Sequence, residues 1–285
     1  MAITITAAER RLLKSVNIPP RPETLILVSK EAKQAEPDVS VIAKAIAADV
    51  GISAAVLQVV NSAAFRRARD IDSIHQAVMT LGFKRVFPIV RAVALKSALQ
   101  QNEQLTNFWD YNERVAAASM LVAEQLGRSA AKDHVYMLGL FQAAGIPVMM
   151  SAFSDYDEIL ERSDELPWHR LIEEERSRYD TTHTTVGALL AQQWSLPKVL
   201  VEVIYYLHEH EDVYLSGELD SLGVDLLSMV KIGRYIADLS FRPDAAEADW
   251  QRVRDTILAR FYLEDYALEE LVADIHERLS DATTA

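Results

Sequence analysis

The chain has no cysteine among its 285 residues. This excludes a disulfide framework, a cysteine-ligated zinc site, an iron–sulfur cluster and a thiol nucleophile. Glycine is also scarce, at 9 residues, which is roughly 3% against a usual ~7%. Because turn-rich β architectures need more glycine, and because half of the residues are hydrophobic, we expect a globular all-α chain.

The sequence lacks a long hydrophobic run. An uncharged stretch at 137–153 is interrupted by Gln142, Gly145 and Pro147 and falls short of the ~20 residues that cross a bilayer. Residues 1–16 are interspersed with charges and lack the apolar segment of a secretory signal. We therefore expect a cytoplasmic protein without a membrane partner.

Positive charge is scarce in the second part of the chain. The net charge is −13, but residues 1–100 carry 14 Lys and Arg against 8 Asp and Glu, whereas residues 101–285 carry 15 against 34. A polar break at 100–104 coincides with this shift. We predict a basic N-terminal helical lobe at 1–104, packed on a larger acidic lobe at 105–285. The opposite charges could help the lobes dock, could steer each to a different partner, or could have no specific role.

Apolar residues recur at helical spacing along the chain. Pro37-Asp38-Val39-Ser40 predicts a helix start, followed by a turn at 49–52 around Gly51 and a helix that Ser53 caps. Further helices are predicted by the following starts and stripes: Ser73 with Ile74, Val78 and Leu81; Val115, Ala118, Val122 and Leu126; Pro197 with Leu200, Val203 and Leu207; Trp250, Val253, Ile257 and Phe261; Leu268, Val272, Ile275 and Leu279.

The segment 41–65 has the helix–turn–helix spacing of some DNA-binding proteins. Its second helix, however, offers only Ser53, Gln58 and Asn61 as polar side chains and no Lys or Arg for phosphates. We interpret the segment as a structural hairpin, and DNA binding is the third-ranked hypothesis.

Histidines could contribute to a hydrolytic metal site. His183 begins one amphipathic helix and His208 ends the next, so the two could meet in an antiparallel hairpin. A catalytic metal usually needs three protein ligands and an open position. No third ligand is evident at helical spacing, and the carboxylate-rich run from Asp155 to Glu175 is interpreted as a solvated face because it lacks calcium-loop spacing.

Several short motifs together resemble the HDOD domains, which are bacterial signalling modules related to the HD-type metal-dependent phosphohydrolases. The resemblance covers about 18–210. It rests on these motifs: Ile18-Pro19-Pro20-Arg21-Pro22; Val41 to Val50; Asn61-Ser62-Ala63-Ala64-Phe65; Ile71-Asp72-Ser73-Ile74; Ala77-Val78; Leu81-Gly82; Phe108-Trp109; Gly139-Leu140; His183 with Val186-Gly187-Ala188; Trp194-Ser195-Leu196-Pro197; and His208. The resemblance implies a multi-helix fold with an HD-like lobe.

The metal-binding positions that the resemblance implies are mostly replaced. The aligned His-Asp pair is Gln142-Ala143, and an amide and a methyl group cannot serve as imidazole and carboxylate ligands. At a position that is often His in such proteins, this chain has Tyr111. Where the resemblance implies a pair of His residues, this chain has Leu207-His208, so one His of the pair is missing. Of the implied ligand set only His183 and His208 remain, so we expect neither a metal nor another cofactor.

We therefore expect a non-catalytic regulatory module that acts through contacts with a signalling protein, with room for a small ligand in the vestigial pocket. Candidate partner or ligand contacts are Asn61, Phe65, Arg66, Arg67 and Arg69, although a solvated basic turn is the simpler interpretation. Nucleic acid is not expected as a partner. The sequence is compatible with a homo-oligomer but does not decide the oligomeric state.

The alternative function is a metal-dependent phosphohydrolase acting on a nucleotide or cyclic dinucleotide. It would need further ligands, such as His210 or Asp155.

Overall fold

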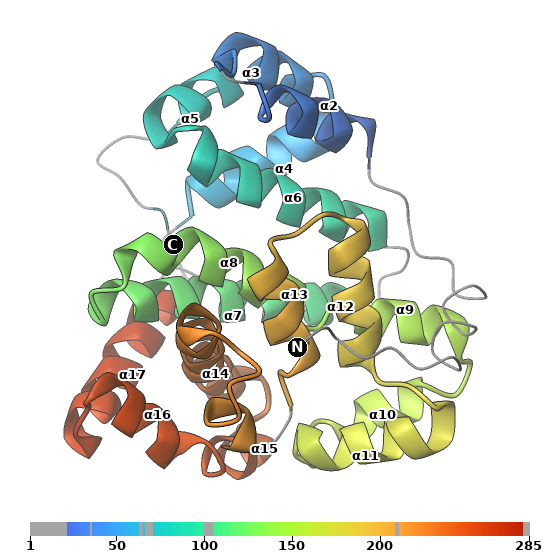
Figure 1. Cartoon of the computed structure of the whole chain (residues 1–285), viewed down its shortest axis with the longest axis vertical. Helices are drawn as coiled ribbons and strands as arrows, with labels where there is room; N and C mark the ends of the chain where they lie inside the picture. The colour runs from blue at the N-terminus through green and yellow to red at the C-terminus, as the bar shows by residue number, and fades with distance from the viewer. Residues whose placement is uncertain are drawn as a thin grey trace. The chain divides into compact units, whose positions relative to one another are not determined.

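A computed structural model describes residues 22–34, 36–62, 65, 71–99, 105–208 and 211–281. These residues form helices and connecting turns, with no strand among them (Figure 1). The predicted all-α class is confirmed. The chain divides into two compact units, one within Pro19–Thr106 together with the chain from Arg278, and one formed by Asn107–Glu277. The predicted boundary after residue 104 adjoins 100–104, which lie outside the described residues, and it stays a prediction.

Among the described residues of the smaller unit, α3 contacts α2 and α5, and α6 contacts α4 and α5. Their bounds are α2 Glu23–Glu31, α3 Val39–Ala47, α4 Val50–Val60, α5 Ile74–Leu81 and α6 Phe83–Leu99. The predicted starts at Asp38 and Ser73 are confirmed, because each side chain caps its helix and accepts a backbone N–H, from Ser40 at 2.7 Å and from Gln76 at 3.1 Å.

The predicted turn at 49–52 is wrong. Asp49, not Ser53, caps α4, since its carboxylate accepts the N–H of Ile52 at 3.0 Å. Gly51 consequently lies in the first helical turn, where a Cβ would make an ordinary contact with Oδ1 of Asp49 at 3.6 Å. Glycine is tolerated there because the cap supplies the local stabilisation that the residue itself lacks. The helices α3 and α4 meet at 111°, as in a helical hairpin.

The larger unit holds the candidate site and the remaining helices, apart from Thr106 and the end of the last helix from Arg278. Their bounds are α7 Thr106–Gln125, η3 Ser129–Ala131, α8 Lys132–Phe141, α9 Gly145–Ala152, α10 Asp157–Arg162, α11 Trp168–Tyr179, α12 His183–Gln193, α13 Lys198–Tyr205, η4 Glu211–Tyr214, α14 Ser221–Phe241, α15 Pro243–Trp250, α16 Arg254–Phe261 and α17 Asp265–Asp281. The predicted stripe from Trp250 to Phe261 is divided, because the chain leaves helical geometry at Val253 between α15 and α16.

Two glycines allow helices of the larger unit to approach closely. A Cβ on Gly145 would lie 1.9 Å from the carbonyl oxygen of His183, and one on Gly233 would lie 2.0 Å from Oγ of Ser119. The first contact brings α9 against the start of α12, where His183 lies. The second brings α14 against α7. Both contacts help to fix the backbone around the candidate site.

One continuous helical run, Ser129–Ala152, is long and apolar enough to meet the length and composition of a membrane span. Protein covers 83% of its most apolar window, as expected for the central helix of a packed core. The bent pair α3 and α4 passes the same test only if the two helices are taken together. The search covers the described residues alone.

Candidate functional site

His183 and His208 lie side by side, as the predicted hairpin of α12 and α13 requires. Their ring centroids are 5.3 Å apart. The indole of Trp168, the first residue of α11, contacts both rings. The distance between ring centroids is 4.7 Å to His183 and 5.5 Å to His208. All three side chains are buried.

Glu175 holds His183 in one orientation. Its carboxylate lies 2.9 Å from Nδ1 of His183 and also accepts the His183 backbone N–H at 2.8 Å. Tyr156 donates its hydroxyl to the same carboxylate, and burial together with Glu175 raises the pKa of Tyr156. Because a carboxylate accepts from an Nδ1–H, Nε2 of His183 is left as an acceptor, and Nε2 has no hydrogen-bond partner among the described residues.

The interpretation of 155–175 as a solvated face is therefore wrong at its last residue. Glu175 is completely buried. The other carboxylates of the run lie at or near the surface, and Asp155 pairs with Arg178 at 2.8 Å. Asp155 shares the Arg178 guanidinium with Glu158 and Glu174.

Gln142 occupies one position of the implied His-Asp pair and belongs to a buried chain of hydrogen bonds. Its Nε2 donates to Oδ1 of Asn112 at 2.8 Å, and Asn112 in turn donates to the carbonyl of Phe108 at 2.7 Å. Nη1 of Arg234, from α14, donates to Oε1 of Gln142. Both polar ends of the Gln142 amide are therefore used inside the protein.

Arg234 belongs to a charged row on α14. Asp238 and Arg242 follow at intervals of four residues, and Arg242 donates to the Asp238 carboxylate at 2.8 Å and to the carbonyl of Ser163 at 2.8 Å. The ring of Tyr111 lies near both guanidinium groups, 6.0 Å from Cζ of Arg234 and 5.5 Å from that of Arg242. Burial raises the pKa of Tyr111 above its ordinary value, so its phenol stays neutral.

Ala143 and Leu207, the other two replaced positions, are buried among apolar side chains. They provide packing and have no lone pair that could bind an ion.

These residues do not fit a hydrolytic divalent metal. His183 and His208 each offer one nitrogen, but no group of three or more His, Cys, Asp or Glu side chains with metal-binding proximity occurs in the described part of the chain. The oxygen of Gln142 already accepts from Arg234, and a guanidinium at this place repels a cation. His210, the other residue that the alternative function could use, lies outside the described residues.

A small pocket adjoins His208. Its lining residues are His208, Lys231, Arg234, Tyr235, Asp238, Ala246, Asp249, Trp250 and Val253. Burial lowers the pKa of His208 well below its ordinary value, and the charges of Arg234 and Lys231 act in the same direction. Burial also lowers the pKa of Lys231, to about 8.

The second predicted set of contacts lies in the smaller unit. Asn61 exchanges two hydrogen bonds with the backbone of Ile71, at 2.9 and 2.8 Å, and thereby ties the end of α4 to the start of the next segment. Phe65 is half-buried. Arg66, Arg67 and Arg69 lie outside the described residues, so their proposed role as a contact patch stays a prediction.

Sequence reasoning missed several residues that shape the site, although a signal for them exists. Trp168, Leu171 and Ile172, Glu175 and Tyr179 recur at helical spacing, so Glu175 lies on the apolar face of α11. Arg234, Asp238 and Arg242 likewise share one face of α14. A charged residue in an apolar stripe indicates a buried, partnered group.

The chain was compared with known proteins. The HDOD domain family model matches residues 18–210. An HDOD domain protein of unknown function from Geobacter sulfurreducens superposes with a TM-score of 0.73 at 20% identity, over 98% of this chain and 95% of that one. A Shewanella amazonensis protein that is provisionally named a phosphohydrolase superposes with a TM-score of 0.68 at 22% identity, over 96% and 98%.

A Treponema pallidum protein without a characterised function is 26% identical over 196 residues, which make up 67% of this chain and 38% of that protein. The chain therefore spans well under half of that relative's length. The structural likenesses support the fold, and the family match extends over more than half of the sequence. The chain belongs to the HDOD domain family.

Proposed function

We propose that this protein is a non-catalytic, cytoplasmic regulatory module of bacterial signal transduction. It acts through contacts with a signalling protein, and a small ligand can occupy the pocket beside His208. The HDOD fold supports a role of this class, as does the replacement of most metal-binding positions that the family resemblance implies.

The observation that carries the proposal is the hydrogen-bond chain from Arg234 through Gln142 to Asn112. In a hydrolytic site of this type, a His-Asp pair would present lone pairs and negative charge to a divalent ion. Here an amide takes the position, and its oxygen is bound to a buried guanidinium.

The alternative, a metal-dependent phosphohydrolase, is favoured by one arrangement. Glu175 fixes His183 with Nε2 free, and an outer carboxylate on the far nitrogen is typical of metal-binding histidines. The proposed regulatory role accounts for this geometry as well, because the same hydrogen bonds satisfy the buried carboxylate of Glu175, which would otherwise be unpaired.

Hydrolysis assays separate the two functions. Purified protein is incubated with added manganese and with a nucleotide phosphodiester, a cyclic dinucleotide and a generic aryl phosphate diester. We expect no turnover above the buffer rate. Manganese-dependent turnover that disappears in His183→Ala, but persists in the matched variant His134→Ala on a distant part of α8, would contradict the proposal.

A further inference from the structure

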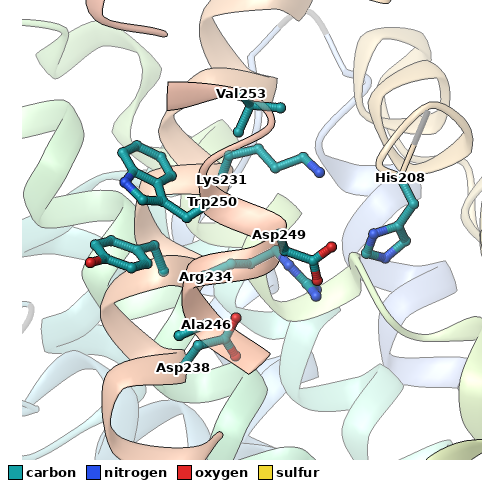
Figure 2. A pocket seen from close by; sticks show the side chains of 9 residues that line it. His208, Lys231, Arg234, Asp238, Ala246, Asp249, Trp250 and Val253 are labelled. Atoms are coloured by element: carbon teal, nitrogen blue, oxygen red, sulfur yellow. The ribbon is translucent and has the colours of Figure 1, made fainter. Parts of the chain in front are cut away.

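The pocket beside His208 is small, and both polar and apolar groups line it. Its volume is about 10 Å³, it is partly open, and it has room for about one water-sized group. Figure 2 shows that the polar ends of His208, Lys231, Arg234 and Asp249 turn toward the same space, and Trp250 also lines the pocket.

Two buried nitrogens in this pocket lack a hydrogen-bond partner. Nε2 of His208 and Nη2 of Arg234 make no hydrogen bond within the described chain, although these side chains are only 8% and 5% exposed. The structure also gives Lys231 no ion pair with any described residue. Unsatisfied buried donors cost free energy, and an unpaired cation costs more. The pocket is therefore built around something that accepts hydrogen bonds.

The carboxylates of the pocket are engaged elsewhere. Asp238 is bound by Arg242 at 2.8 Å. Asp249 accepts the backbone N–H of Trp168 at 3.0 Å and faces Nδ1 of His169 at 3.6 Å. Asp249 keeps its negative charge, because a backbone N–H does not cancel it, so the pocket holds two cations, Lys231 and Arg234, against the charge of Asp249. Burial is the main cause of the low pKa of Lys231, and Arg234 and Arg252 add to it, whereas Asp249 and Asp238 act in the opposite direction.

We propose that this pocket binds one oxyanion group, the phosphate or carboxylate end of a small acidic ligand. One oxygen enters the pocket and accepts hydrogen bonds from Nη2 of Arg234, the ammonium of Lys231 and the His208 imidazole, and the rest of the ligand lies toward the open side. Guanidinium and ammonium groups together are well suited to such oxygens. The inference rests on the proposed ligand-binding role and names the ligand's chemistry.

The test is a calorimetric titration with inorganic phosphate and with acetate, at pH 7, with sodium chloride adjusted to keep the ionic strength constant. We expect saturable binding of at least one of the two, and the stronger one identifies the source as phosphate or carboxylate. Lys231→Gln should weaken that binding by about tenfold, equivalent to about 1.4 kcal/mol, and Lys231→Arg should restore most of it. The matched control is Lys198→Gln, which removes the same charge from an exposed site on α13 and should leave binding unchanged.

The oxyanion site would be overturned if neither phosphate nor acetate bound saturably. Equal weakening by Lys231→Gln and Lys198→Gln would also overturn it, because the effect would then come from overall charge. Neither result would affect the non-catalytic role, which fails instead on manganese-dependent hydrolysis. Arg234 is left unchanged in these variants because it also supports Gln142.

Discussion

At the residue scale, the site is defined by buried polar groups that satisfy one another. Glu175 accepts from His183 and Tyr156, and Arg234 donates to Gln142. A buried charge without such partners would cost several kcal/mol. These hydrogen bonds satisfy groups that burial would otherwise leave unpaired, whereas Nε2 of His183, Nε2 of His208 and Nη2 of Arg234 make no hydrogen bond within the described chain.

The lowered pKa of His208 predicts a stability that depends on pH. The folded chain holds His208 neutral, whereas in the unfolded chain its pKa is about 6.5. Above that value His208 is neutral in both states. As the pH falls below about 6.5 only the unfolded chain takes up the proton, so the free energy of unfolding should fall by up to about 1.4 kcal/mol per pH unit. The groups acting on His208 are Arg234, Lys231, His183 and Arg242.

Urea denaturation at a series of pH values from 8 to 5 checks this prediction. His169, whose pKa burial also lowers, contributes in the same direction, so the comparison is between variants. His208→Gln should flatten the decline between pH 6.5 and 5, and the surface variant His134→Gln should not. Equal slopes in all three proteins would show that His208 titrates normally in the folded state.

At the element scale, close backbone contacts position the helices that carry the site. Figure 1 shows α9 and α12 in the larger unit, and the contact at Gly145 joins α9 to the first turn of α12. The backbone of His183 is part of this contact, so the orientation of its ring depends on the packing of the two helices as well as on Glu175.

Gly145→Ala should therefore be strongly destabilising. The new Cβ would lie 1.9 Å from the His183 carbonyl oxygen and 2.7 Å from the Gly187 nitrogen, and backbone atoms cannot move aside cheaply. We expect a loss of about 3 kcal/mol or more in the free energy of unfolding, measured by chemical denaturation.

Gly51→Ala is the matched control, since its Cβ would meet nothing closer than 3.6 Å. Alanine is a better helix former by about 1 kcal/mol, so this variant should be neutral or slightly more stable. Similar losses in both variants would contradict the assigned role of the Gly145 contact.

Many elements could be predicted from the sequence because their signals are local. The caps at Asp38 and Ser73 and the apolar stripes depend on residues within one or two turns. The start of α4 was misplaced because Asp49 competes with Ser53 as a cap, and only the observed hydrogen bond decides between them. The site was harder to predict. His183 and His208 could be paired from their neighbouring helices, whereas Arg234 reaches Gln142 across 92 positions of sequence, a contact that no local pattern encodes.

At the scale of the whole molecule, the site depends on helices beyond the segment that defines the family. The family match ends at residue 210. Lys231, Arg234, Asp238 and Arg242 lie on α14, and Asp249 lies on α15, after that point. The C-terminal helices therefore complete the site, placing a guanidinium beside Gln142 and cations around the pocket at His208. This part of the chain is acidic overall, so the local positive charge is specific to the site.

The most direct test of the central claim is the metal content of protein purified without a chelator or a His-tag. Elemental mass spectrometry would report iron, manganese, zinc and nickel per chain. Because Gln142 and Ala143 stand at the positions that the family resemblance assigns to a His-Asp pair, the account predicts a total well below one metal ion per chain, unchanged after incubation with manganese and desalting. One or more tightly bound ions per chain, lost in His183→Ala, would contradict it.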